Sequence, residues 1–106
     1  MSNAKKDFVI ALGGSIMHPD EINVAYIKEF YNFIKAATER GMRFVIVVGG
    51  GALTRKFQRA AAEITDVTDD DKDWLGIHTT RLNAHLLRTV LRQEAHAAIL
   101  DGRYKL

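Results

Sequence analysis

The sequence FVIVVGGGALTR at residues 44–55 decides the fold of this chain. Its first five residues are apolar and mostly β-branched, which is typical of a strand buried on both faces of a parallel sheet. Three glycines, Gly49 to Gly51, follow at once, and good helix formers continue from Leu53 to Ile64. The stretch therefore predicts a strand, a glycine turn and a helix.

A strand, a glycine turn and a helix in this order are typical of a site for a phosphate group. Glycines let backbone N–H groups approach an anion, the first N–H groups of a helix have no partner within the helix, and Arg55 can reach back with its guanidinium. The alternative is a turn that needs glycine only for its backbone angles. The dinucleotide-binding and P-loop motifs are excluded, because Ala52, Leu53 and Thr54 follow the glycines.

The rest of the chain predicts an α/β fold. A first strand at Phe8–Leu12 also runs into glycines, at Gly13–Ser15, an amphipathic helix follows at Asn23–Arg40, and a third strand is expected at Ala97–Leu100. Because the carboxyl ends of parallel strands lie at one edge of a sheet, both glycine turns are expected to face the same bound molecule. From the residues alone, the serine of the first turn could contact phosphate or cap a helix.

A long helix is predicted from Trp74 to about Glu94, after a loop at residues 65–72. The three aspartates at 69–71 favour a solvated helix entrance over a cation site, since the EF-hand spacing is missing. On the helical wheel Thr79, Thr80 and Asn83 fall among leucines, where buried hydroxyl and amide groups need partners. They are expected to bond within the core or to face a neighbouring loop or ligand.

Composition narrows the class of protein. The chain has 106 residues, 47% of them hydrophobic, and a net charge of only +2, which is typical of one small soluble domain and does not call for nucleic acid. It has no cysteine and no pair of histidines at helical metal-binding spacing, so no metal site is predicted. No apolar run is long enough to span a membrane, and the cytoplasm is the expected location. Residues 1–7 are expected to be disordered or derived from a tag.

Three motifs carry a resemblance to a known family. They are ALGGSI at residues 11–16, VVGGG at 47–51 with Arg55, and DWLGI at 73–77 followed by TRLNA at 80–84. Together they resemble the amino acid kinase superfamily, and within it the archaeal type of uridylate kinase. The first two motifs are shared by the superfamily, and the third narrows the resemblance, which spans Phe8 to about Leu100.

The resemblance implies a three-layer αβα fold with a mostly parallel sheet, of which residues 8–106 form the N-terminal, acceptor-nucleotide side. It implies in-line phosphoryl transfer from ATP to UMP, giving UDP for pyrimidine nucleotide biosynthesis, with Mg²⁺ across the phosphates. It further implies a homo-oligomer built from dimers, a hexamer being one such form. The implied ligands of ATP are Gly14, Ser15, Gly51 and Arg55, and those of UMP are Gly50, Asp73, Thr80 and Asn83. No catalytic residue is assigned.

Two departures from the family pattern bear on activity. Many members have a lysine where this chain has Ala11. Members are also about twice as long, and their second half supplies the adenine pocket and a catalytic aspartate. The chain is therefore expected to be an N-terminal part that binds uridylate or phosphate weakly and does not turn over alone. The alternatives are a related kinase acting on a carboxylate or another small acid, and a non-catalytic nucleotide-binding, anion-binding or assembly module.

Overall fold

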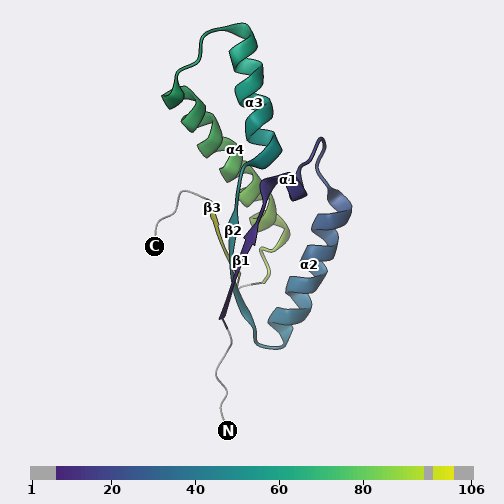
Figure 1. Ribbon diagram of the computed structural model, residues 1–106. Helices are drawn as coiled ribbons and strands as arrows, with labels where there is room; N and C mark the ends of the chain where they lie inside the picture. Colours follow the sequence, from purple (N-terminus) through teal and green to yellow (C-terminus); the bar gives the residue numbers. More distant parts are fainter. Residues whose placement is uncertain (1–6, 95–96, 102–106) are drawn as a thin grey trace.

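The computed structural model describes residues 7–94 and 97–101. The three strands pair in parallel in the order β1-β2-β3, as Figure 1 shows. The predicted α/β class and parallel sheet are confirmed. In chain order the elements are β1 Asp7–Leu12, α1 Gly14–Met17, α2 Val24–Glu39, β2 Arg43–Val48, α3 Gly51–Ile64, α4 Asp69–Val90 and β3 Ala97–Asp101.

The start of the sheet differs by one residue from the expectation. Asp7 was assigned to a disordered or tag-derived tail, but it belongs to β1 and pairs with Arg43 at the start of β2. The two side chains also form an ion pair, which extends the strand pairing to this end. The rest of the expected tail, residues 1–6, lies outside the described residues.

One face of the sheet carries the core. Phe44, Ile46 and Val48 alternate along β2 and are all buried. They pack against Ile34 and neighbouring apolar residues of α2, and against Leu87 and neighbouring apolar residues of α4. Helices α2 and α4 therefore cover the same face. With the strands in sequential order, two right-handed crossovers lead to this one side.

The opposite face of the sheet is not covered by the described residues. Val9 is 73% exposed, and Val45 and Val47 are only partly buried. The expectation that residues 44–48 are buried on both faces is therefore wrong for the described part of the chain. A run of apolar residues on one strand cannot tell whether a second helical layer is present, whereas the order of the strands places both crossovers on one side.

Helix α4 begins five residues earlier than predicted. Thr68 is its N-cap, with its hydroxyl accepting from the N–H of Asp71 at 3.1 Å while the Asp71 carboxylate accepts from the N–H of Thr68 at 3.3 Å. This capping box, with the acidic first turn beside the positive end of the helix dipole, turns residues 69–72 from the predicted loop into helix. The helix also ends at Val90, four residues before the predicted end.

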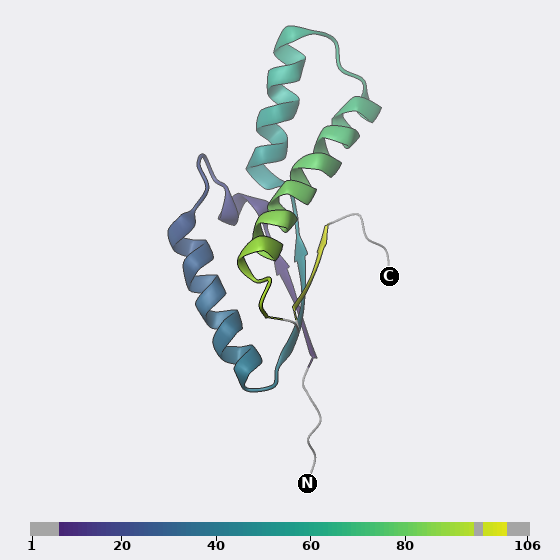
Figure 2. The same cartoon turned by 180° about the vertical axis from the view of Figure 1, so that it is seen from behind.

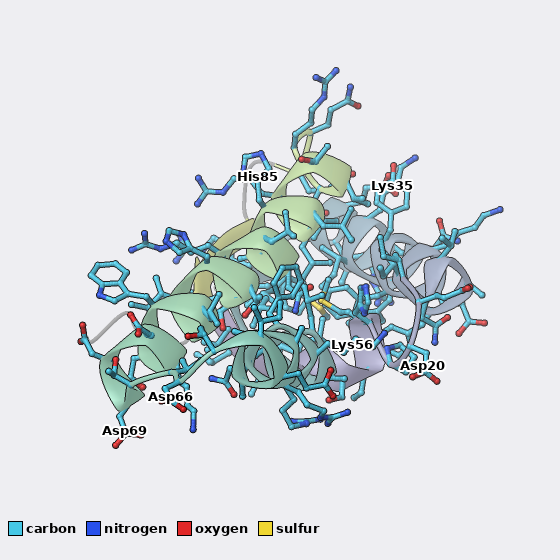
Figure 3. The ribbon with its side chains drawn as sticks, turned by 90° about the horizontal axis from the view of Figure 1, so that it is seen from above. Asp20, Lys35, Lys56, Asp66, Asp69 and His85 are labelled. Atoms are coloured by element: carbon cyan, nitrogen blue, oxygen red, sulfur yellow. The ribbon has the colours of Figure 1, made fainter. Side chains whose placement is uncertain are left out.

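Helices α3 and α4 form an antiparallel pair that extends beyond the carboxyl edge of the sheet, as Figures 1 and 2 show from opposite sides. Asp66 and Asp69 lie at the outer end of this pair (Figure 3). At the inner end, the Lys56 ammonium donates to the carbonyl of Asp20, in the loop between α1 and α2. Within the described ranges, no helix combines the length and apolar character needed to cross a membrane.

Candidate functional site

The two glycine turns touch each other at the carboxyl edge of the sheet. A Cβ atom added to Gly14 would lie 2.3 Å from the carbonyl oxygen of Gly49, and one added to Gly51 would lie 2.3 Å from the backbone nitrogen of Ser15. Gly51 also has a φ of +54°, which L side chains rarely adopt. Glycine is thus required here both for the backbone angle and for the close approach of the two turns.

Ser15 joins the first turn to helix α3. Its hydroxyl oxygen accepts from the backbone N–H of Ala52 at 3.0 Å and from the Arg55 guanidinium at 3.1 Å. Two donors of α3 therefore converge on one oxygen at the joint between the turns. Of the predicted ATP ligands, the structure brings Gly14, Ser15, Gly51 and Arg55 together at this joint.

Asn83 joins the second turn to helix α4. It is only 3% exposed, and its Nδ2 donates to the carbonyl of Gly49 at 3.1 Å and to that of Gly50 at 3.4 Å. Of the two alternatives left open by the sequence, the structure shows the second for this residue, because its partner is a neighbouring loop. The buried amide is satisfied by the turn, as the need for partners requires.

The two buried threonines of α4 have different surroundings. The Thr79 hydroxyl donates to the carbonyl of Leu75 at 2.9 Å and also shares a hydrogen bond with the hydroxyl of Thr54 on α3. Thr80 instead borders the second turn, since a Cβ atom added to Gly50 would lie 2.8 Å from its hydroxyl oxygen. Thr79 is therefore a core contact, and Thr80 lies beside the glycines.

A polar cleft of about 350 Å³ opens between α3 and α4 beside the second turn. Five of the eight predicted ligands line it, whereas Asn83 and the residues of the first turn do not. Within the described residues, the structure thus brings predicted ATP and UMP ligands to one cleft. The lining residues are Gly50, Gly51, Thr54, Arg55, Gln58, Lys72, Asp73, Gly76, Ile77 and Thr80.

The charges at the cleft are mixed. Arg55 and Lys72 line it together with the carboxylate of Asp73. A guanidinium can bind two phosphate oxygens at once, an ammonium adds a point charge, and a carboxylate accepts from sugar hydroxyls. The set can therefore hold a ligand that carries both an anion and hydroxyl groups.

Several residues of the cleft were not predicted from the sequence, among them Gln58 and Lys72. Gln58 donates through Nε2 to the backbone carbonyl of Lys72 at 3.0 Å, which ties α3 to the first turns of α4. Lys72 was missed because it was placed in a loop. Had the helix been started at Thr68, the four-residue spacing of Lys72, Gly76 and Thr80 would have put them on one helical face.

Metal ligands are sparse in the described ranges. No group of three histidine, aspartate or glutamate side chains there could hold a metal ion. The three aspartates at 69–71 form the acidic first turn of α4, where Asp71 completes the capping box, and Asp73 follows and lines the cleft.

The sequence is similar to a known family and to its curated members. The model of the amino acid kinase family matches residues 6–103. The uridylate kinase of Thermococcus sibiricus is 38% identical over 94 residues, which make up 88% of this chain and 40% of that protein. The uridylate kinase of Methanococcus maripaludis strain C5 is 37% identical over 90 residues, 84% of this chain and 39% of that protein.

A solved structure shares the fold. The crystal structure of uridylate kinase from Archaeoglobus fulgidus matches with a TM-score of 0.71 and 26% sequence identity. The match covers 93% of this chain and 51% of that one. The chain thus spans about 40% of the length of the curated relatives named above.

Proposed function

This chain belongs to the amino acid kinase family, and we propose that it is the N-terminal, acceptor-side part of a UMP kinase. The reaction is the transfer of the γ-phosphoryl group of ATP to UMP, which gives UDP and ADP. The observation that carries the proposal is the cleft at which Gly50, Gly51, Arg55 and Asp73 meet. The similarity to uridylate kinases supports the choice of acceptor.

On the acceptor side, the proposal places the phosphate of UMP at the second glycine turn. The N–H groups at the start of α3 have no partner within the helix, and the helix dipole favours an anion there. Asp73 would accept from the ribose hydroxyls at the other side of the cleft, and Thr80 would border the nucleotide. The cleft supplies these groups from two different helices, α3 and α4.

On the donor side, the proposal places the phosphates of ATP at the joint between the turns, near Gly14, Ser15, Gly51 and Arg55. In-line phosphoryl transfer needs two anions held in line and their charge neutralised, with little covalent work by the protein. Arg55 is suited to both tasks, because it lines the cleft and also reaches the Ser15 hydroxyl of the first turn.

Mg²⁺ is part of the proposal as the companion of ATP. This ion takes oxygen ligands and is usually held by one or two carboxylates together with substrate phosphates. Asp73 is the carboxylate that lines the cleft among the described residues, so the ion would depend mainly on phosphate oxygens. We further propose that the enzyme acts in the cytoplasm, in pyrimidine nucleotide biosynthesis, as a homo-oligomer built from dimers.

Calorimetric titration with UMP, aspartate and ATP separately tests the proposal. We expect saturable UMP binding that weakens at least tenfold in Arg55→Ala and in Asp73→Asn, because each removes a group that faces the cleft. The matched controls are Arg59→Ala on α3 and Asp70→Asn on α4, which change exposed residues that do not line the cleft. Both controls should bind UMP like the unmodified chain.

Two outcomes would contradict the proposal. Preference for aspartate over UMP would favour a kinase acting on a carboxylate. Absence of binding to all three compounds would favour an assembly module, for which the uncovered face of the sheet is available. An assay of UDP formation from UMP and ATP then asks separately whether the chain turns over by itself.

A further inference from the structure

Asn83 is predicted to bind UMP, but in the structure its side-chain amide donates to the second glycine turn. Its carboxamide nitrogen has two hydrogens, and its two acceptors are the consecutive carbonyls of Gly49 and Gly50, at 3.1 and 3.4 Å. Its side chain does not line the polar cleft. It borders a separate, mostly apolar pocket with Met17 and Leu53. Asn83 therefore contacts the second turn from outside the polar cleft.

The geometry of the peptide bond shows where the N–H groups of Gly50 and Gly51 point. The described peptide bonds are all trans, and in a trans peptide the C=O and the N–H point in opposite directions. The carbonyl of Gly49 shares a peptide with the N–H of Gly50, and the carbonyl of Gly50 shares one with the N–H of Gly51. Because Asn83 donates to both carbonyls, both N–H groups point away from the Asn83 side chain, which does not line the cleft.

The backbone angles bring these N–H groups together. Gly50 is in the right-handed helical region, with φ −85° and ψ −34°, and Gly51 follows with a φ of +54°. A right-handed residue followed by a left-handed one makes successive N–H groups converge into a concavity that binds anions. Both glycines line the cleft.

We propose that Asn83 is a positioning residue that fixes these two peptides, so that the N–H groups of Gly50 and Gly51 are presented to a phosphate group. The identity of the nucleotide phosphate, that of UMP at Gly50 or of ATP at Gly51, rests on the proposed function. The role of Asn83 requires only an anion with phosphate chemistry, and inorganic phosphate can therefore serve as the probe.

Titration of the ¹⁵N-labelled chain with inorganic phosphate, followed by NMR at the Gly50 and Gly51 amides, tests the role. In the unmodified chain phosphate should shift both amide resonances in a saturable manner. Asn83→Asp replaces the donor by an oxygen that faces two carbonyl oxygens, and we expect it to displace both resonances before phosphate is added. We also expect it to weaken phosphate binding at least tenfold.

The matched control is Thr79→Val. Thr79 is also a buried polar residue of α4, but its hydroxyl bonds to the carbonyl of Leu75 and to Thr54 rather than to the glycine turn. A general loss of stability would affect both variants, whereas a loss of peptide orientation affects only Asn83→Asp. If Asn83→Asp does not fold, Asn83→Ala removes the donor without adding a carboxylate, and the expected loss of phosphate binding is the same.

The outcomes separate this role from the proposed function. If phosphate moves the two glycine amides and Asn83→Asp abolishes that response, the role stands even when UMP binds no better than phosphate. Phosphate affinity of Asn83→Asp within twofold of the unmodified chain overturns the role and leaves the UMP kinase proposal intact. The role is also overturned if phosphate shifts neither glycine amide in the unmodified chain.

Discussion

The two glycine turns have similar sequences but different constraints. In the first turn, an added Cβ at Gly13 would meet nothing within 4 Å, whereas Gly14 is crowded by the other turn. In the second turn, both Gly50 and Gly51 are crowded by side chains or backbone. Repeated glycines in a sequence are therefore not equally necessary. The strict requirement lies where the two turns touch.

The support behind each turn differs as well. The first turn begins α1, a helix of 4 residues, whereas the second begins α3, a helix of 14 residues. The second turn is also held by Asn83 from α4. A turn held by two long helices keeps its N–H groups in place before a ligand arrives, which lowers the cost of ordering on binding. This difference makes the second turn the more firmly held of the two.

The largest expected effect comes from placing a methyl group between the two turns where they touch. Gly51→Ala places a Cβ atom 2.3 Å from the backbone nitrogen of Ser15 and keeps a φ of +54°. Backbone cannot yield as a flexible side chain does, so we expect a loss of at least about 2 kcal/mol in the free energy of unfolding. Urea denaturation followed by circular dichroism measures it.

Gly13→Ala is the matched control for this comparison. Gly13 has a φ of −66° and a ψ of 134°, a conformation open to any residue, and its Cβ has free space. We expect a change within about 0.5 kcal/mol. Equal destabilisation by Gly13→Ala and Gly51→Ala would break the comparison, because it would mean that the two turns are equally constrained.

A smaller effect is expected from removing the link between the turns. Ser15→Ala takes away the oxygen that accepts from both Ala52 N–H and Arg55. We expect a loss of about 1 kcal/mol in the free energy of unfolding, since the N–H of Ala52 is left without this partner. Thr38→Ala is the control, because the Thr38 hydroxyl donates to the nearby carbonyl of Lys35 on an exposed helix surface. If both variants lose the same amount, Ser15 does not join the turns in solution.

The contact between the turns could be predicted in part. Two apolar strands that end in glycines place both turns at one edge, and this expectation was correct. The burial of Thr79, Thr80 and Asn83 also followed from their helical positions. Such inferences need only local periodicity and the common direction of parallel strands.

Two features that the sequence left open or missed depend on contacts between distant residues. Asn83 reaches a carbonyl 34 positions earlier in the chain, and no local pattern reports that a buried amide will bond to a glycine turn from behind. The exposed face of the sheet depends on the strand order, which the apolar run at 44–48 does not encode. The early start of α4 had a local signal, the Thr68 and Asp71 capping box, which was overlooked.

At the other end of β1 and β2, the ion pair between Asp7 and Arg43 is the weakest of the contacts compared. Arg43 donates to Asp7 through Nε at 2.6 Å and through Nη2 at 2.9 Å, but the two side chains are 47% and 64% exposed, respectively. The hydrogen bond from Arg43 lowers the pKa of Asp7 below its usual 3.8; desolvation opposes this shift, and the charge of the guanidinium adds to it. Exposed pairs of this kind are screened by solvent and contribute little.

Asp7→Asn should therefore have the smallest effect of this series and should leave phosphate binding at the glycine turns unchanged. Because the pKa of Asp7 is lower in the folded chain, the pair stabilises the fold above the unfolded-state pKa. That contribution is lost as the pH falls through the folded-state pKa. Urea denaturation at pH 7 should show a slight deficit for Asp7→Asn, which closes at a pH below both pKa values. A deficit as large as that of Ser15→Ala, or weaker phosphate binding, would show that the two ends of β1 and β2 are coupled, and the contrast between the turns could then no longer be attributed to their own contacts.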